Sequence, residues 1–480
     1  MTRARALSLW LLALASCDAG PMLVGIDRGT PIQIGGQGGA GGQVTGGQGG
    51  VAPSGGSGQT GAGMSGTSGQ SGAGASGGQG PGGAAGQGGA GQGGAAGSPL
   101  DGPLDALIAA MPPGSWKELP GTAMQPVCPS DDYYACRAVL VAWSGGVLDS
   151  VNDRLVVFGG GYSDSYVNSV FTFDLGTGLW KRWTSLPAGL TGGIQPAFVD
   201  MRIEPCGFYP SVASLDIPAG WLDTNGYLLP SYCDDPSIVA QLDLQQPRST
   251  HSFGNLAFSA ATGRFYLLGG THQYHSGQAY SPHLLSFDFT TGLWARGPLN
   301  EQLGHGASAT DASGHVWYLG NDAGHLASYD PVADAWTTYQ APSLGYYYSG
   351  AAIDPVRHRL VLTHDGSVVT TYDLDSPDAA PQQPPTAGLS AGLQGEGAPG
   401  FEYLPSLDRL VMWTGGRAIQ WLDPSTWTWT SVEGSGDDPG APALNGTFGR
   451  FRYSPKRGVF LVINAIDANV FLFKPPLAAP

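Results

Sequence analysis

The amino-acid sequence predicts an all-β fold, a six-bladed β-propeller that is closed by an N-terminal strand and preceded by a disordered Gly-rich tether. Three observations lead to this prediction. An apolar strand recurs six times, at intervals of about fifty residues. A glycine stands about nine residues before each copy, and in four copies an Asp is followed six residues later by a Trp.

The first 17 residues have the pattern of an export signal. Arg3 and Arg5 precede an apolar run over residues 6–15, which is too short to cross a bilayer as a helix. The run leads into a Leu-Ala-Ser-Cys sequence ending at Cys17, which resembles the lipidation box of bacterial lipoproteins. An ordinary secretory signal is the alternative. We expect a lipid-anchored protein of the bacterial cell envelope, periplasmic or surface-exposed, and the sequence does not separate inner from outer membrane.

Residues 18–100 are expected to form the tether. Almost half of the residues from 35 to 97 are Gly, and none is charged. Such a stretch cannot bury enough apolar surface to offset its ordering entropy, and as a coil its mean span is about 45 Å. We therefore expect it to hold the folded part, residues 101–480, clear of the membrane.

The charge balance argues against one class of partner. The chain has 21 Lys+Arg and 37 Asp+Glu, a formal net charge of −16. Nucleic acid is not expected as a partner, because phosphate contacts need clustered Lys and Arg. The lipid anchor is the membrane contact we expect, and a monomer is the expected state.

Each copy of the repeat predicts four short strands, which make one propeller blade. Turn sequences such as Asn152-Asp153 and Thr262-Gly263 separate the first strand from the apolar second strand. The fourth strand carries the Trp of the pairs Asp174/Trp180, Asp288/Trp294, Asp330/Trp336 and Asp423/Trp429. We expect the glycines on the innermost strands, where a side chain does not fit the crowded axis; they are Gly145, Gly254, Gly306, Gly350, Gly400 and Gly449.

The repeat resembles the kelch repeat, with Gly-Gly after the second strand and Trp in the fourth, over roughly residues 115–475. The sixth copy ends after its third strand at residues 470–473, whereas residues 115–120 match a fourth strand and have no blade of their own. We expect these two segments to pair and close the ring, which removes the exposed edges of an open sheet. An open or irregular array of sheets is the alternative.

Five cysteines fit an oxidising compartment. If Cys17 is lipidated, four remain, which allow three pairings. We favour disulfides Cys128–Cys136 and Cys206–Cys233, because each pair lies within one non-repetitive segment. Free or metal-binding thiols are the alternative.

The long loops indicate where a ligand binds. The loops before the first strand of a blade and between its second and third strands share one face, and in this chain they are the long ones, so we call it the long-loop face. The turns between the first and second and between the third and fourth strands share the other, short-turn face. The insertion over residues 186–250 is expected to lie over the long-loop face as a lid.

The candidate ligand-binding residues lie on this face. His251 and His305 stand beside the innermost strands, nearest to the expected channel mouth, and neutral His is a common metal ligand and general base. Arg450 has a similar position in the sixth copy and could hold an anionic group or pair with an acidic neighbour. His272 and His275 could be two metal ligands in one loop, and solvated loop histidines are the alternative. The remaining candidates are Trp143, Tyr348 and Glu396.

No familiar catalytic motif occurs in the folded part, and the sequence requires no cofactor. Galactose-oxidase-like proteins are similar in blade pattern, but the resemblance implies a Cys-linked Tyr at copper that no Cys here could supply. Sialic-acid mutarotase is similar in having six kelch blades, and its catalytic residues do not map onto positions of this chain. The sequence therefore favours a propeller that binds a glycan or a surface protein on the long-loop face. A mutarotase- or oxidase-like carbohydrate-active enzyme on that face is the alternative, so catalysis stays open, and a purely structural surface protein is a third possibility.

Overall fold

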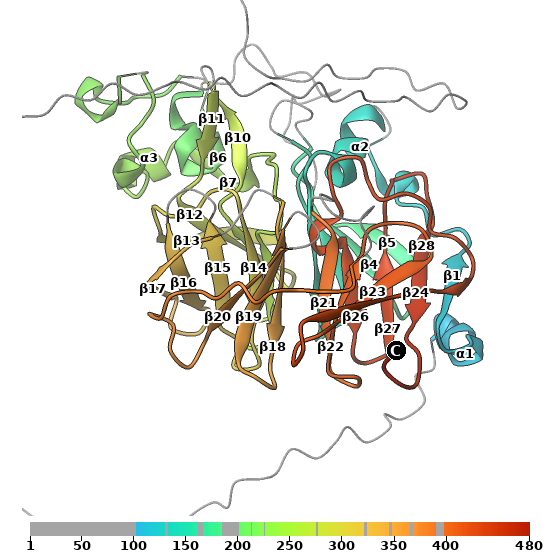
Figure 1. Cartoon of the computed structure of the whole chain (residues 1–480). Helices are drawn as coiled ribbons and strands as arrows, with labels where there is room; N and C mark the ends of the chain where they lie inside the picture. The colour runs from blue at the N-terminus through green and yellow to red at the C-terminus, as the bar shows by residue number, and fades with distance from the viewer. Residues whose placement is uncertain are drawn as a thin grey trace, which may run out of the picture. The chain divides into compact units, whose positions relative to one another are not determined.

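The structure, a computed structural model, shows an all-β fold with six sheets arranged as the blades of a β-propeller (Figure 1). This confirms the predicted fold class. The residues that it describes are 102–129, 133–161, 167–184, 201–212, 214–224, 226–274, 277–320, 324–344, 348–364, 368–389 and 398–480.

Blades 1, 2, 3 and 5 each have the four antiparallel strands that the repeat predicts. Blade 1 contains β2 (Gly146–Asp149), β3 (Arg154–Val157), β4 (Phe171–Asp174) and β5 (Leu179–Arg182). Blade 2 contains β8 (Leu256–Ser259), β9 (Arg264–Leu268), β12 (His283–Asp288) and β13 (Leu293–Leu299). Blade 3 contains β14 (Gly306–Thr310), β15 (Val316–Gly320), β16 (His325–Asp330) and β17 (Ala335–Pro342). Blade 5 contains β21 (Gly400–Leu404), β22 (Arg409–Trp413), β23 (Ala418–Asp423) and β24 (Thr428–Glu433).

Blade 4 has three strands in its sheet, and its sequence copy is the one that has an Asp but no following Trp. Its strands are β18 (Gly350–Asp354), β19 (Arg359–His364) and β20 (Val368–Asp373). Gln382 forms an isolated antiparallel bridge with Thr371 of β20, and Ala387 forms a parallel bridge with Thr428 of β24. An extended segment that bridges to blade 5 therefore takes the place of the fourth strand.

The N-terminal strand closes the ring in blade 6, as predicted. The blade contains β26 (Phe451–Ser454), β27 (Val459–Val462), β28 (Val470–Lys474) and β1 (Ser115–Leu119), and β1 pairs antiparallel with β28. The short strand β25 (Ser435–Gly436) pairs with the outer edge of β1. Directly after β25, a carboxylate oxygen of Asp437 accepts hydrogen bonds from the Lys117 side chain at 2.8 Å and the Glu118 backbone N–H at 2.9 Å.

The innermost strands form a closed cycle, each packed against the next: β2, β8, β14, β18, β21, β26 and again β2. The glycines of the repeat lie at or beside the start of these strands, as expected. At Gly400 an added Cβ would lie 2.3 Å from the Cβ of Phe451 in blade 6. At Gly145 it would lie 2.0 Å from the carbonyl oxygen of Phe253 in blade 2. Adjacent blades therefore approach so closely near the axis that these positions have no room for a side chain.

The apolar core lies between the blades. One cluster joins Trp413 and Trp421 of blade 5 to Phe451 and Phe460 of blade 6 and to Trp116 of the closing strand. Because each blade buries its faces against its neighbours, the stability of the ring depends on every interface being present.

Helices and small strands lie outside the blades. Figure 1 shows α2 (Tyr133–Val141) and α3 (Pro236–Val239) at one end of the ring and α1 (Pro103–Ala110) at the other. The hairpin β10 (Thr271–Tyr274) and β11 (Gly277–Tyr280) joins β9 to β12. The 3₁₀ turns are η1 (Gln125–Val127), η2 (Met201–Cys206), η3 (Ala219–Trp221), η4 (Pro230–Tyr232) and η6 (Phe448–Arg450). In the described part of the chain, no helix is long and apolar enough to cross a membrane.

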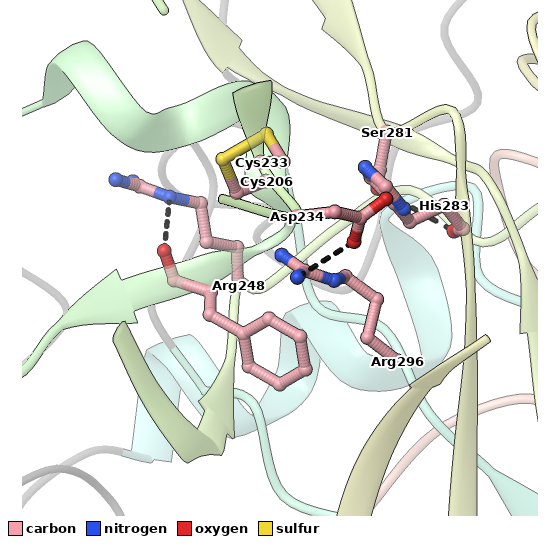
Figure 2. The surroundings of a disulfide bond; sticks show 8 residues. Cys206, Cys233, Asp234, Arg248, Ser281, His283 and Arg296 are labelled. Atoms are coloured by element: carbon pink, nitrogen blue, oxygen red, sulfur yellow. Dashed lines mark hydrogen bonds and ion pairs between the residues drawn. A yellow bond between two sulfur atoms is a disulfide. The ribbon is translucent and has the colours of Figure 1, made fainter. Parts of the chain in front are cut away.

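Two disulfides join the favoured pairs, Cys128–Cys136 and Cys206–Cys233. The second lies in the insertion, whose strands are β6 (Phe208–Pro210) and β7 (Leu242–Pro247) (Figure 2). Beside it, Arg296 of β13 makes an ion pair with Asp234 at 2.8 Å. The buried side chains of the insertion join the core between blades 1 and 2, and Figure 1 shows β6, β7 and α3 at the same end of the ring as α2. The expected lid over the long-loop face stays a prediction, because residues 186–200 of the insertion lie outside the described ranges.

Candidate ligand-binding site

The loops that lead into the innermost strands bring a set of mostly aromatic side chains together at one end of the central axis. All six blades contribute to this set, which we call the aromatic cap. Its members are Trp143 from blade 1, His251 and Phe253 from blade 2, His305 from blade 3, Tyr348 from blade 4, Ala398 from blade 5 and Phe448 from blade 6.

Phe253 is the centre of the aromatic cap. Its ring centroid lies 4.5 Å from that of His305 and 5.8 Å from that of Phe448, both in edge-on arrangements. The ring of His251 lies 4.8 Å from that of Trp143. Offset and edge-on aromatic pairs at these separations each add about 0.5–1.5 kcal/mol beyond the area that they bury. The cap is therefore a cohesive cluster.

Two cap residues from opposite blades meet over the central axis. The indole Nε1–H of Trp143 donates a hydrogen bond to the Tyr348 hydroxyl at 3.2 Å. Blades 1 and 4, which carry these residues, are opposite one another in a ring of six. Tyr348 is 41% exposed and Trp143 is half-buried, whereas Phe253, His305 and Phe448 are buried. Trp143 and Tyr348 therefore form the outer surface of the cap.

The backbone under the cap is in an unusual conformation. Trp143, Phe253, Ala398 and Phe448 have φ values of 47°, 45°, 51° and 47°. This left-handed region is unfavourable for bulky residues and is concentrated at functional sites. Backbone hydrogen bonds between blades hold it: the Phe253 N–H donates to the Trp143 carbonyl at 2.7 Å, and the Phe448 N–H donates to the Ala398 carbonyl at 3.1 Å. Contacts between blades therefore hold the backbone of these four cap residues in place.

His305 is uncharged at neutral pH. Its side chain is 1% exposed, and burial, with a smaller contribution from nearby His251, lowers its pKa to about 3. A neutral imidazole keeps one ring nitrogen as a donor and one as an acceptor. His305 is thus suited to hydrogen bonding and not to supplying a proton near pH 7.

The buried state of His305 predicts a loss of stability in acid. The His pKa is about 6.5 in the unfolded chain and about 3 in the folded protein, so the unfolded chain binds this proton first as the pH falls. The contribution of His305 to the free energy of unfolding is therefore fully present above about pH 6.5 and is lost progressively toward pH 3. From pH 7 to pH 5 the free energy of unfolding should fall by about 2 kcal/mol through this group. Urea unfolding at pH 7 and at pH 5 measures this decrease, and in the His305→Gln variant the decrease should be smaller than in the wild type by about that amount. Parallel curves for the two proteins would contradict this assignment.

Arg450 lies next to the cap and is fully buried, with 0% exposure. It ends the 3₁₀ turn η6, which begins with the cap residue Phe448. Its Nη2 donates to the carbonyl of Gly446. Gly446 packs closely against two cap residues, since a Cβ added there would lie 2.3 Å from the Cβ of Ala398 and 3.0 Å from the ring of Phe448.

The structure brings together five of the six predicted ligand-binding residues. Trp143, His251, His305 and Tyr348 belong to the cap, and Arg450 is adjacent to it. Glu396 lies outside the described residues. The expected pairing of Arg450 with an acidic neighbour is not found among the side chains that the structure describes.

The predicted metal pair remains untested. His272 lies in β10, its side chain is not described, and His275 is outside the described ranges. Across those ranges, no group of three or more His, Cys, Asp or Glu side chains is placed to hold a metal ion.

Sequence reasoning missed Phe253, Ala398 and Phe448. Each stands one or two residues before the inner glycine of its blade, so the register of the repeat could have singled them out. Their left-handed backbone and their mutual contacts follow from the ring geometry and leave no mark in the sequence.

The fold and the cap define the class of protein as a six-bladed β-propeller, a scaffold that is compatible with ligand binding by its loops. Comparison with protein-family models and with curated proteins finds no match for this chain.

Proposed function

We propose that the chain is an extracytoplasmic propeller of the kelch type, held by a lipid anchor at Cys17, that binds a glycan on the outer side of the aromatic cap. The observation that carries this proposal is the pair Trp143 and Tyr348, which are joined by a hydrogen bond and accessible from outside.

The chemistry of the cap suits a sugar. The C–H face of a pyranose ring stacks on indole and phenol rings, while its hydroxyl groups need donors and acceptors nearby. Trp and Tyr combine an apolar ring with a polar group, and they contribute large contact areas at little conformational entropy. The buried rings of Phe253 and Phe448 hold the pair in place, which lowers the cost of ordering it on binding.

The described part of the chain begins on the side of the propeller away from the cap. A Cβ added at Gly102, just before α1, would lie 2.6 Å from the carbonyl oxygen of Gly176 in the turn between β4 and β5. Arg457 of blade 6 pairs with Asp105 of α1. The described part of the chain thus begins at the short-turn face, opposite to the cap, which is compatible with attachment through the N-terminal segment.

Glycan binding can be tested on the full-length chain with an oligosaccharide array and titration calorimetry of the glycans retained. We expect Trp143→Ala to weaken the affinity at least tenfold, a loss of about 1.4 kcal/mol or more. Trp427→Ala is the matched control, because Trp427 is also half-buried, has a φ of 57° and lies on the short-turn face. It should bind as the wild type does.

Three results would count against the proposal. Equal affinities of Trp143→Ala and the wild type would show that the cap is not the glycan site. Retention of protein ligands and of no glycan would favour a protein partner at this face. Turnover of a retained glycan that is lost in His251→Ala/His305→Ala would move the enzyme alternative ahead.

A further inference from the structure

We propose that Arg450 is the centre of an anion site that takes a carboxylate group at the edge of the aromatic cap. The inference concerns the charge of the bound group and can hold whether that group is a free small carboxylate or part of the proposed glycan. It starts from a cation that is buried without a counter-ion.

The hydrogen-bonding capacity of Arg450 is largely unused. Its guanidinium carries five N–H donors, and Nη2 makes the bond to Gly446. The Nε and Nη1 atoms are buried and have no hydrogen-bond partner. Buried donors of a charged group that stay unsatisfied are more destabilising than those of a neutral group. An acceptor at these nitrogens would remove that penalty.

Several other arginines that are at least partly buried are paired with a carboxylate of this chain. Arg154, with a side chain 10% exposed, pairs with Asp149 at 2.6 Å, and Arg452, 12% exposed, pairs with Glu402 at 3.0 Å. Ion pairs with carboxylates are made in the same way by Arg296, Arg357, Arg409 and Arg457. Arg450 makes no such pair with any side chain that the structure describes. A carboxylate from outside the chain would give it the partner that its counterparts have within the chain.

The surrounding backbone leaves room for the long side chain. A Cβ at Gly146 of β2 would lie 3.1 Å from the Cγ of Arg450, so a larger residue there would displace it. The absence of a side chain at Gly146 thus lets the Arg450 side chain lie between blades 6 and 1. Gly446, which holds Nη2, contacts Ala398 and Phe448 of the cap.

Burial has a measurable consequence for the charge. Desolvation lowers the pKa of Arg450 to about 9, so the group is still a cation at pH 7. Isolated buried charges are destabilising, and their replacement by an apolar residue of similar volume is often neutral or stabilising. An anion that binds only the folded state would stabilise the wild type and not a variant without the arginine.

The test compares Arg450→Met with the wild type in full-length protein, using formate and acetate as probes and acetamide as the uncharged analogue of acetate. Ionic strength is held constant with a bulky sulfonate. The melting temperature of the wild type should rise by roughly 3 °C at a formate concentration about 100-fold above its dissociation constant. It should not respond to acetamide. Without formate, Arg450→Met should melt at or above the wild-type temperature, and formate should leave it unchanged.

Arg417→Met is the matched control, because Arg417 is a partly exposed arginine that is paired with Glu433. It should respond to formate as the wild type does. Equal formate responses of wild type and Arg450→Met would overturn the proposal. If Arg450→Met does not fold, equilibrium dialysis of wild-type protein with isotope-labelled formate decides: one formate per chain supports the site, and no binding overturns it.

A second pair of probes separates the two sources of the carboxylate. Glucuronate binding that is lost in Arg450→Met, with glucose bound more weakly, places the carboxylate on a sugar. Formate binding without glucuronate binding places it on a free small anion. A wild type that binds neither carboxylate refutes the anion site, whereas the proposed glycan function is decided separately by Trp143→Ala.

Discussion

Replacing Trp116 by alanine is expected to lower the free energy of unfolding by about 3–5 kcal/mol, the range for removing a buried Trp from a core. Trp116 is 1% exposed in β1 and packs on Phe473 and Trp413, with ring centroids 4.9 and 6.2 Å away. Its Nε1–H also donates to the carbonyl of Arg417 at 3.0 Å. The substitution therefore loosens the strand that closes the ring as well as the interface of blades 5 and 6.

Urea unfolding followed by tryptophan fluorescence and by circular dichroism measures this loss. Trp221→Ala is the control, because Trp221 lies in the insertion, half-buried and stacked on Tyr232 at 4.5 Å. It should lose no more than about 1.5 kcal/mol. Similar losses for the two variants would mean that the closing strand contributes no more to stability than a peripheral aromatic pair.

The Gly400→Ala variant is expected to lose about 1–3 kcal/mol or more, although it adds a single methyl group. The new Cβ would lie 2.3 Å from the Cβ of Phe451, which is attached directly to the backbone of the next blade. No rotamer change can relieve such a contact, so blades 5 and 6 must move apart. Gly220→Ala is the matched control, since no heavy atom lies within 4 Å of a Cβ there.

Thermal unfolding of both glycine variants gives the answer. We expect Gly220→Ala to be neutral or slightly stabilising, because alanine restricts the unfolded chain. If Gly400→Ala melted at the wild-type temperature, the inner strands would be able to separate freely, and the explanation of the glycine series by crowding would be wrong.

The fold could be predicted because several independent features mark the same strands in most copies of the repeat. The apolar second strand, the inner glycine and the Asp/Trp pair coincide in most copies, and each feature has a separate physical role in a blade. Closure by residues 115–120 was predictable for the same reason, since one blade lacked a strand and one strand lacked a blade. Blade 4 departs from the pattern where its Trp is missing, and a segment bridged through Gln382 and Ala387 could not be foreseen from that absence.

The sequence predicted where the candidate site lies in the propeller, but it predicted only some of the residues that form the site. His251, His305 and Arg450 were found because they stand next to inner strands, where the ring must converge. Phe253 and Phe448 were missed because aromatic residues near a strand are usually core residues, and nothing local indicates their left-handed backbone. The sequence allowed an acidic partner for Arg450, and its unpaired burial depends on contacts between blades 6 and 1 that no local pattern encodes.

Closure by β1 has a consequence for the order of folding. This strand is synthesised before any blade, whereas its partner β28 (Val470–Lys474) follows every other blade strand in the chain. Contacts so distant in sequence are slow to form, since the loop entropy is lost before they contribute. Until β28 is synthesised, β1 has no partner on that side and the nascent blades have an open edge that could pair with another chain. Completion of the ring therefore waits until the last blade strand has been synthesised, and the unclosed chain is the species most exposed to aggregation.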